Sequence, residues 1–235
     1  MPKTTNLDKV KNVAMTFLSM PIEDTEMSPI IIQHPIFESG FQSIIVNGEF
    51  KITNITEDKD GLRQVTNTLR KQIECATDLL GVFIVIRNSY KLVFLKYIKQ
   101  YLSKSDFSKL LADAWVLSEN PNDDANVSVR TLASWFKHAD KKALMTEEDY
   151  EVYKSLPDTI TVYRGITPGH NPKGLSWTQN IDTARWFANR YDNEGYIQKA
   201  VIDKSRALAY LNTRNEDELV VDTRGLKFEV ITDGD

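Results

Sequence analysis

The feature that most constrains the fold is an abrupt change of sequence pattern at Pro157. In the residues before it, from about residue 88, apolar side chains recur at three- and four-residue intervals, which is the spacing of amphipathic helices. After it, short β-branched and aromatic runs are separated by turn-forming residues, which is typical of strands. A helical block followed by a mostly β block predicts an α+β unit over residues 88–235.

The β block is expected to contain six short strands and one helix. The helix is predicted over Asp182–Tyr191, with Asp182 as its N-cap. Alternation and β-propensity place the strands at Ile160–Ile166, Gly174–Thr178, Tyr196–Ile202, Ala207–Leu211, Glu218–Val221 and Leu226–Ile231.

The helical block is punctuated by recognisable start and stop signals. Ser105 is expected to cap a helix that runs to Leu117. Thr146 with Asp149 three residues later resembles a capping box, and Pro157 should stop the helix that begins there. Two further helices are expected over Tyr90–Leu102 and Val127–Leu144, and 120–124 is expected to be a loop.

Residues 1–87 are expected to form a separate, smaller α/β module. Asn47-Gly48 lies between two β-prone runs, and both residues tolerate positive φ, so a two-residue hairpin turn is predicted there. The next segment has helical spacing, and Gly81 is expected to end that helix. The hairpin strands are expected at Phe41–Val46 and Glu49–Thr53, the helix at Asp58–Leu80, and a strand or a buried helical segment at Val82–Ile86. The pattern assigns no role to this module.

Composition argues against several kinds of partner. The formal charge of −4 gives no long-range attraction for nucleic acid or an anionic membrane. Cys75 is the only cysteine and the three histidines are scattered, so neither an internal disulfide nor a metal site is expected. Neither a secretory signal nor an apolar run long enough to span a bilayer is recognised. A soluble, cytoplasmic protein without a membrane partner is therefore expected.

Two carboxylates lie two residues apart where a strand is predicted, at Glu216 and Glu218. Side chains alternate along a strand, so these two should share one face while Asp217 points to the other. Like charges on one face repel, which is unfavourable unless the pair is used. One carboxylate near a ribose can stabilise a ribosyl cation, and the second can orient or deprotonate a nucleophile. The alternative is a solvated acidic turn.

A cation and two hydroxyls are predicted on neighbouring strands. Arg164 should emerge from a mostly apolar strand, next to Gly165, where the backbone can turn sharply. A guanidinium suits bidentate binding of a diphosphate or support of a carboxylate, and a surface arginine at a strand end is the alternative. Ser176 and Thr178 should share a face, on which their hydroxyls can bond a ribose and fix a carboxylate. Trp177 should pack in the core.

Taken in order, Tyr163-Arg164-Gly165, Ser176-Trp177-Thr178 and Glu216-Asp217-Glu218 resemble the R-S-E class of mono-ADP-ribosyltransferases. That class includes cholera-like and clostridial binary-toxin-like enzymes. The resemblance covers about residues 158–232, a third of the chain. It implies an ADP-ribosyltransferase-like fold, in which a helical block is followed by two packed, mostly antiparallel sheets. It also implies NAD as a substrate and no metal.

The resemblance assigns a role to each motif. Arg164 looks like the family arginine that contacts an NAD phosphate. Ser176 looks like the serine that bonds the nicotinamide ribose and positions the catalytic glutamate, and Thr178 takes the place of a second serine in that motif. Glu218 looks like the catalytic glutamate. Glu216 looks like the upstream member of a Glu-X-Glu pair, which in this family accompanies an arginine acceptor.

The remaining binding residues follow from the same resemblance. Tyr163, Gly165 and Phe187 complete the expected NAD-binding set, although Phe187 also fits a core position. Tyr163 and Trp186 are candidates for stacking on nicotinamide or adenine. Tyr210–Asn215 would be the loop that recognises the target. Trp177, where the family motif has a threonine, is the clearest departure.

The implied function is NAD-dependent mono-ADP-ribosylation of an arginine on an unidentified target protein, with release of nicotinamide. Two enzymatic alternatives are an NAD glycohydrolase and a transferase that modifies nucleic acid, although the acidic charge argues against the latter. A third alternative is an inactive fold that serves as a binding or inhibitor module. Small relatives of this kind occur in phages and bacterial toxin systems, which implies a phage or toxin-like origin and action in a bacterial host cytoplasm.

Overall fold

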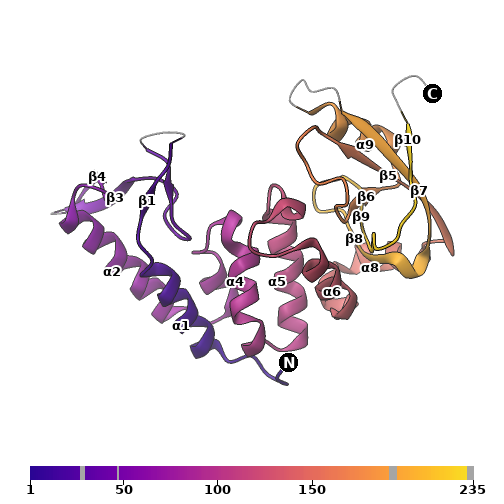
Figure 1. The fold of residues 1–235 in the computed structure, drawn as a ribbon. Helices are drawn as coiled ribbons and strands as arrows, with labels where there is room; N and C mark the ends of the chain where they lie inside the picture. Colours follow the sequence, from indigo (N-terminus) through magenta and orange to yellow (C-terminus); the bar gives the residue numbers. More distant parts are fainter. Residues whose placement is uncertain (27–29, 47, 191–194, 232–235) are drawn as a thin grey trace. The chain divides into compact units, whose positions relative to one another are not determined.

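The computed structural model describes residues 1–26, 30–46, 48–190 and 195–231. The chain forms two compact units, Met1–Ser103 and Lys104–Asp235 (Figure 1). Each combines helices with antiparallel strands, so the α+β class predicted from the pattern is confirmed. The boundary follows Ser103 rather than residue 87, because the helix after residue 90 packs within the first unit. There, Phe94 meets Phe17 edge-on, with ring centroids 5.2 Å apart.

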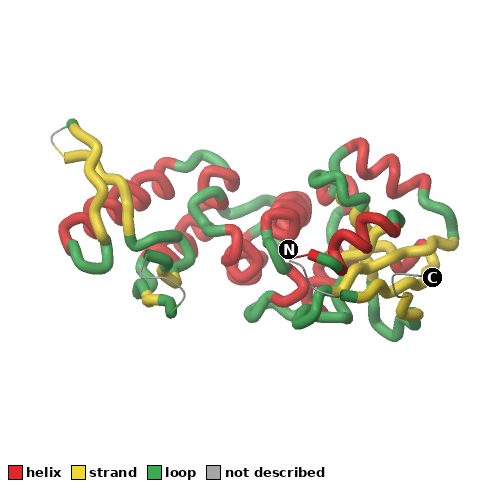
Figure 2. The backbone as a smooth tube through the Cα atoms, turned by 90° about the horizontal axis from the view of Figure 1, so that it is seen from above, coloured by secondary structure: helices red, strands yellow, loops and turns green. Residues whose placement is uncertain are grey.

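Unit 1 is built from helices and two small antiparallel sheets, seen in yellow beside the red helices in Figure 2. Its helices are α1 (Leu7–Leu18), α2 (Lys59–Cys75), α3 (Leu79–Phe83) and α4 (Lys91–Ile98). Its strands are β1 (Glu23–Asp24), β2 (Ile32–Gln33), β3 (Phe41–Val46) and β4 (Glu49–Asn54). The two sheets pair β1 with β2 and β3 with β4.

The hairpin strands β3 and β4 are confirmed, with pairing that runs from Phe41↔Asn54 to Val46↔Glu49. Gly48 has a φ of +85°, as the hairpin turn requires, while Asn47 lies outside the described residues.

The long helix expected over 58–80 is wrong at its C-terminal end. The helix begins where it was expected, with Asp58 as its N-cap, but it stops at Cys75 and Gly81 does not terminate it. Asp78 instead starts a second helix by accepting a hydrogen bond from the backbone N–H of Gly81 at 2.8 Å. The apolar run expected at Val82–Ile86 therefore begins inside α3, which fits the helical alternative rather than a strand.

The helices of unit 2 are α5 (Lys104–Leu117), α6 (Val129–His138), α7 (Lys141–Leu144), α8 (Glu147–Ser155) and α9 (Ile181–Ala188). Ser105 lies inside α5 instead of capping it. The single helix expected over 127–144 is two helices, because Asp140 caps a new one by accepting from the N–H of Lys142. Thr146 does cap α8, with its Oγ1 accepting from the N–H of Asp149 at 3.1 Å.

The strands of unit 2 form one antiparallel six-stranded sheet in the order β10-β7-β5-β6-β9-β8. They are β5 (Thr159–Ile166), β6 (Ser176–Thr178), β7 (Tyr196–Asp203), β8 (Ala207–Leu211), β9 (Glu218–Val221) and β10 (Glu229–Ile231). Two packed sheets were expected. One sheet results because β5 and β6 join at a single paired position, Tyr163↔Thr178. The halves β10-β7-β5 and β6-β9-β8 meet there.

Helix α9 packs against β5 through a very close contact. A Cβ at Gly165 would lie 2.0 Å from the carbonyl oxygen of Ala184 and 2.6 Å from the nitrogen of Ala188, so only glycine allows this approach. The N-cap of α9 is Asn180 rather than Asp182, since the Asn180 side chain accepts from the first backbone N–H groups. Tyr191, the expected end of this helix, lies outside the described residues.

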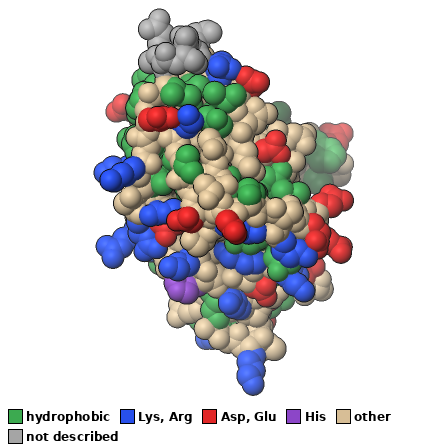
Figure 3. Space-filling model, turned by 90° about the vertical axis from the view of Figure 1, so that its right-hand side faces the viewer, with side chains coloured by type: hydrophobic (Ala, Val, Ile, Leu, Met, Phe, Trp, Pro, Cys, Tyr) green, Lys and Arg blue, Asp and Glu red, His purple; other side chains and the backbone are tan. Residues whose placement is uncertain are grey.

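Two surface properties bear on partners. On the face seen in Figure 3, Lys and Arg side chains are interspersed with Asp and Glu. Within the described ranges, none of the helices has both the length and the apolar character needed to cross a bilayer.

Candidate functional site

A pocket in unit 2 lies at the β5–β6 junction. It brings together residues that the sequence spreads over three motifs and one helix. Its lining includes Tyr163, Arg164, Gly165, Ser176, Thr178, Phe187, Glu216 and Glu218, which is the whole set of predicted site residues. The motifs therefore converge on one place.

Glu218 is the most buried acid of the pocket. It opens β9, opposite Thr178 of β6, and is 5% exposed. The indole Nε1 of Trp115 donates to its Oε1 at 2.9 Å. Burial raises the pKa of this carboxyl, while hydrogen bonds from Ser176 and Trp115 and the charge of Arg214 oppose the rise. The neighbouring charge of Glu216 raises the same pKa further.

Glu216 reaches the pocket in a different way from the one expected. Strand β9 begins only at Glu218, so alternation along a strand does not relate the two carboxylates. Asn215 and Asp217 instead have positive φ values of 57° and 47°, which fold the preceding residues into a tight turn. In this turn Glu216 Oε2 lies 3.1 Å from Nη2 of Arg214. The prediction of a shared strand face was therefore wrong, although both acids line the pocket.

Asp217 is held by other partners. The phenol of Tyr210 donates to its Oδ1 at 2.6 Å, and its own N–H donates to Oδ1 of Asn212 at 3.0 Å. These bonds fix the turn that presents Glu216 and Glu218.

The two predicted hydroxyls have distinct settings. Ser176 Oγ accepts a hydrogen bond from Nδ2 of Asn122 at 3.0 Å. Thr178 is buried, and its Oγ1 accepts from the N–H of Asn180 at 3.1 Å, which ties it to the cap of α9. Trp177 between them is 2% exposed and donates to the carbonyl of Gly174 at 3.1 Å, so its predicted core position is confirmed.

Arg164 braces the backbone around the pocket. Its Nη1 donates to the carbonyl of Ser176 at 2.7 Å and its Nη2 to that of Asn171 at 3.1 Å. Its Nε is buried and has no hydrogen-bond partner among the described residues. Burial lowers the pKa of the guanidinium to about 10, with Glu218 and Asp123 opposing the shift, so the group stays cationic at neutral pH. The expected contact with a phosphate stays a prediction.

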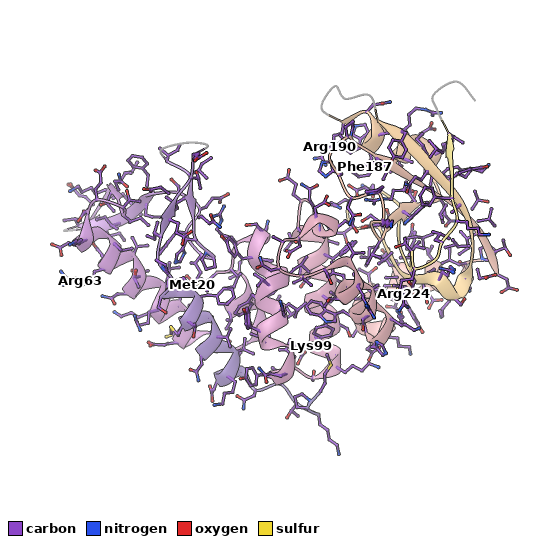
Figure 4. All side chains as sticks on the ribbon, in the orientation of Figure 1. Met20, Arg63, Lys99, Phe187, Arg190 and Arg224 are labelled. Atoms are coloured by element: carbon purple, nitrogen blue, oxygen red, sulfur yellow. The ribbon has the colours of Figure 1, made fainter. Side chains whose placement is uncertain are left out.

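Aromatic and cationic side chains from α9 and the residues after it form another wall. Phe187 lines the pocket and meets Trp186 edge-on, with ring centroids 4.9 Å apart. Arg190 also lines the pocket, and its guanidinium lies 5.4 Å from the centroid of Trp186 (Figure 4 labels Phe187 and Arg190). Tyr163 packs partly on the small core cluster that contains Ala184.

Several residues in or behind the pocket were missed by sequence reasoning. Trp115 of α5 does not line the pocket but bonds Glu218 from behind it. Asn122 lies in the 3-10 helix η3 (Pro121–Asp123) and lines the pocket. Asp123 accepts from the N–H of Asn171 at 3.1 Å and pairs with His170 Nδ1 at 3.0 Å. The motif Asn-Pro-Asn-Asp-Asp indicates a loop, but nothing in it indicates contact with a strand that lies 54 residues later.

The pocket thus combines three arginines, at 164, 190 and 214, with four acids, at 119, 123, 216 and 218, and an aromatic wall. Such a site fits a ligand that has both anionic groups and a flat ring. In the described part of the chain, no three His, Cys, Asp or Glu side chains are grouped so that they could hold a metal ion.

Comparisons with protein-family models, with curated proteins and with solved structures find no match for this chain. Its function must therefore be inferred from the site itself.

Proposed function

We propose that the protein is an NAD-dependent mono-ADP-ribosyltransferase that transfers ADP-ribose to an arginine of a target protein and releases nicotinamide. Unit 2 would then be an ADP-ribosyltransferase-like catalytic domain. One observation carries the proposal: the arginine, serine and glutamate motifs line a single pocket around the buried carboxylate of Glu218. No motif alone would support it.

Glu218 has the setting that cleavage of the nicotinamide–ribose bond needs. As C1′–N breaks and nicotinamide leaves with the bonding electrons, positive charge develops on the ribose. A carboxylate held by fixed donors in a buried site stabilises that charge without reorganising. Ser176, which contacts Glu218, also has a hydroxyl that can bond the ribose. The reaction as proposed uses no metal.

The cations of the pocket suit the diphosphate of NAD. Arg164 supplies buried positive charge and holds the backbone of β6 in place. Arg190 contributes a second guanidinium from the residues after α9. Phe187 and Tyr163 offer ring faces or edges for the flat groups of the ligand.

Glu216 supports an arginine acceptor. It already binds a guanidinium, that of Arg214, at 3.1 Å, so its position and charge suit this group. A guanidinium has a pKa above ~12, so attack on C1′ needs a base that orients it and takes its proton. Glu216 would fill that role, with ADP-ribose joined to the acceptor nitrogen.

Mass spectrometry of a lysate treated with the protein and NAD tests this directly. The expected result is an added ADP-ribose on an arginine of a lysate protein, together with free nicotinamide. The Glu218→Gln variant keeps the shape and loses the charge, so its rate should fall at least about 100-fold. Transfer by this variant at the wild-type rate would contradict the proposed role of Glu218.

One observation favours NAD glycohydrolysis as a second candidate. In this structure Arg214 is paired with the carboxylate of Glu216. An arginine acceptor would have to displace Arg214 from that carboxylate, whereas a water molecule would not. Isotope-labelled NAD separates the outcomes, because the label ends on protein, on nucleic acid or in free ADP-ribose. If no nicotinamide is released at all, the protein is better described as a binding or inhibitor module.

A further inference from the structure

The side chain of Trp115 is fully buried. Its one polar atom, the indole Nε1, is hydrogen-bonded to Glu218. The side chain is 0% exposed, and its Nε1–H donates to Glu218 Oε1 at 2.9 Å. Phe136 of α6 fixes the indole edge-on, with ring centroids 5.0 Å apart and planes at 85°. An indole N–H can only donate, so this contact favours the ionised carboxylate and one orientation of it.

Asn122 acts on a second possible donor to the same carboxylate, the hydroxyl of Ser176. Its Oδ1 accepts from the N–H of Leu175 at 2.6 Å, which fixes how the amide is turned. Its Nδ2 therefore faces Ser176 Oγ, 3.0 Å away, and can only donate to it. The hydroxyl hydrogen of Ser176 therefore remains available for Glu218, the carboxyl whose pKa Ser176 lowers.

We propose that Trp115 and Asn122 are positioning residues, one acting directly on Glu218 and the other through Ser176, that hold the carboxylate in its reactive orientation. This inference rests on the proposed function. Both residues come from the helical segment before the sheet, 103 and 54 residues from their respective partners. The helical segment before the sheet then contributes to the reaction by orienting the hydrogen-bond donors of Glu218 on β9.

The bond itself can be tested without any turnover. In an 15N spectrum, the indole N–H resonance of Trp115, assigned by its loss in Trp115→Phe, should shift with pH as Glu218 titrates. Burial raises the pKa of Glu218, so the midpoint should lie above the ordinary carboxyl range. The step should vanish in Glu218→Gln. An indole resonance that does not respond to pH would overturn the assignment.

Kinetics test the positioning role. Trp115→Phe keeps an aromatic ring against Phe136 and removes the donor. The kcat for nicotinamide release should fall about 10- to 100-fold, with KM for NAD changed less than about threefold. Without the donor the pKa of Glu218 rises further, so the acid limb of the kcat profile should move to higher pH. Trp135→Phe is the matched control, because Trp135 packs on Phe107 instead, with ring centroids 5.6 Å apart. It should leave kcat and the profile unchanged.

Asn122→Asp separates the second contact from packing. The carboxylate has nearly the same shape and still accepts from Leu175, but it also accepts the hydroxyl hydrogen of Ser176 and draws it from Glu218. A similar loss of kcat and a shift of the acid limb to higher pH are expected. Wild-type kcat and pH profiles in both variants would overturn the inference. If the wild type releases no nicotinamide but the indole titrates with Glu218, the proposed function fails and the Trp115 contact stands.

Discussion

Both units bury charged or titratable side chains, but they place them differently. In unit 1, Arg87 donates from Nη1 to the carbonyls of Ile32, His34 and Phe37, and Lys91 donates to those of Phe83 and Ile86. These side chains tie backbone segments together. Arg87 is half-buried and Lys91 is buried. In unit 2, Glu218 is as buried as Lys91, yet it lines a pocket with further charged groups. Burial of charge is thus a sign of function only where the charge also faces a space that a ligand can fill.

Arg164 lies between these two cases. Its Nη atoms bind backbone carbonyls, as the cations of unit 1 do, while the residue also lines the pocket. A Cβ at Gly174 would lie 2.3 Å from Nη2, so the chain leaves room for the guanidinium by having no side chain there. The main role of the Arg164 guanidinium is therefore to hold the backbone of the site, and its positive charge is in addition available to a ligand.

Glu218→Gln should give the largest separation between activity and stability. Activity should fall at least about 100-fold, because the charge proposed to stabilise the ribosyl cation is lost. The free energy of unfolding should stay equal or rise, since burial raises the pKa of Glu218 and ionising it at neutral pH disfavours the folded state. Urea denaturation and nicotinamide release measure the two quantities. Glu229→Gln, on β10 of the same sheet, is the control and should change neither. Equal losses of stability and activity in Glu218→Gln would make Glu218 a structural residue.

His34 should make the stability of unit 1 depend on pH. It is 1% exposed, and burial, with a smaller contribution from the charge of Arg87, lowers its pKa to about 4. In the unfolded chain the pKa of His34 is about 6.5, so as the pH falls the unfolded state takes up a proton at His34 before the folded state does. The free energy of unfolding should therefore decrease by about 3 kcal/mol between pH 6.5 and 4 and then level off.

Hydrogen exchange of unit 1 amides as a function of pH measures this dependence. His34→Asn retains an acceptor for the N–H groups of Ile36 and Phe37, which bond Nδ1 at 3.1 and 3.0 Å, and removes the titration. The pH dependence should disappear in this variant and persist in His138→Gln, where an exposed histidine is lost. Persistence in His34→Asn would assign the effect to another group.

Lys91→Met should have the opposite effect to Glu218→Gln, with stability lowered and activity unchanged. The apolar chain keeps the packing, but the carbonyls of Phe83 and Ile86 lose their donor in a buried place. A loss of about 1–3 kcal/mol in the stability of unit 1 is expected, with nicotinamide release unchanged. Lys96→Met, an exposed position on the same helix, should cost less than about 0.5 kcal/mol. A drop in activity with Lys91→Met would show that unit 1 takes part in the reaction.

Local signals made most of the fold of unit 2 predictable. Strands β5 to β9 lie within a residue or two of the expected runs, because alternation and turn residues are read along the chain. The convergence of Arg164, Ser176 and Glu218 on one pocket was implied by the resemblance of the ordered motifs to a known family, not by a local signal. The direction in which Glu216 points was not predicted correctly. Strand alternation does not hold there, because Asn215 and Asp217 adopt the left-handed backbone conformation. Asn and Asp tolerate that conformation, so the signal for a turn was present in the sequence.

Contacts between distant segments left no local signal. The sequence pattern places Trp115 at an apolar helix position. Only the folded chain brings its indole into contact with the carboxylate of Glu218, 103 residues away. The sequence around Asn122 indicates a loop, and its two hydrogen bonds, with Leu175 and with Ser176 of β6, depend on how η3 packs against that strand. Sequence patterns therefore located the groups that line the pocket but not the groups that hold them from behind.

Arg214→Ala should have the smallest effect and bears on the acceptor. The Arg214–Glu216 pair is partly exposed, with side chains 40% and 23% accessible, and such pairs contribute roughly 0.2–1 kcal/mol. Releasing Glu216 should lower the KM for a soluble acceptor such as arginine methyl ester about two- to fivefold. Arg224→Ala, which removes an arginine paired with Asp222, is the control. A higher KM would mean that Arg214 itself binds the substrate, and Glu216 would then resemble the structural carboxylates of the fold more than it resembles Glu218.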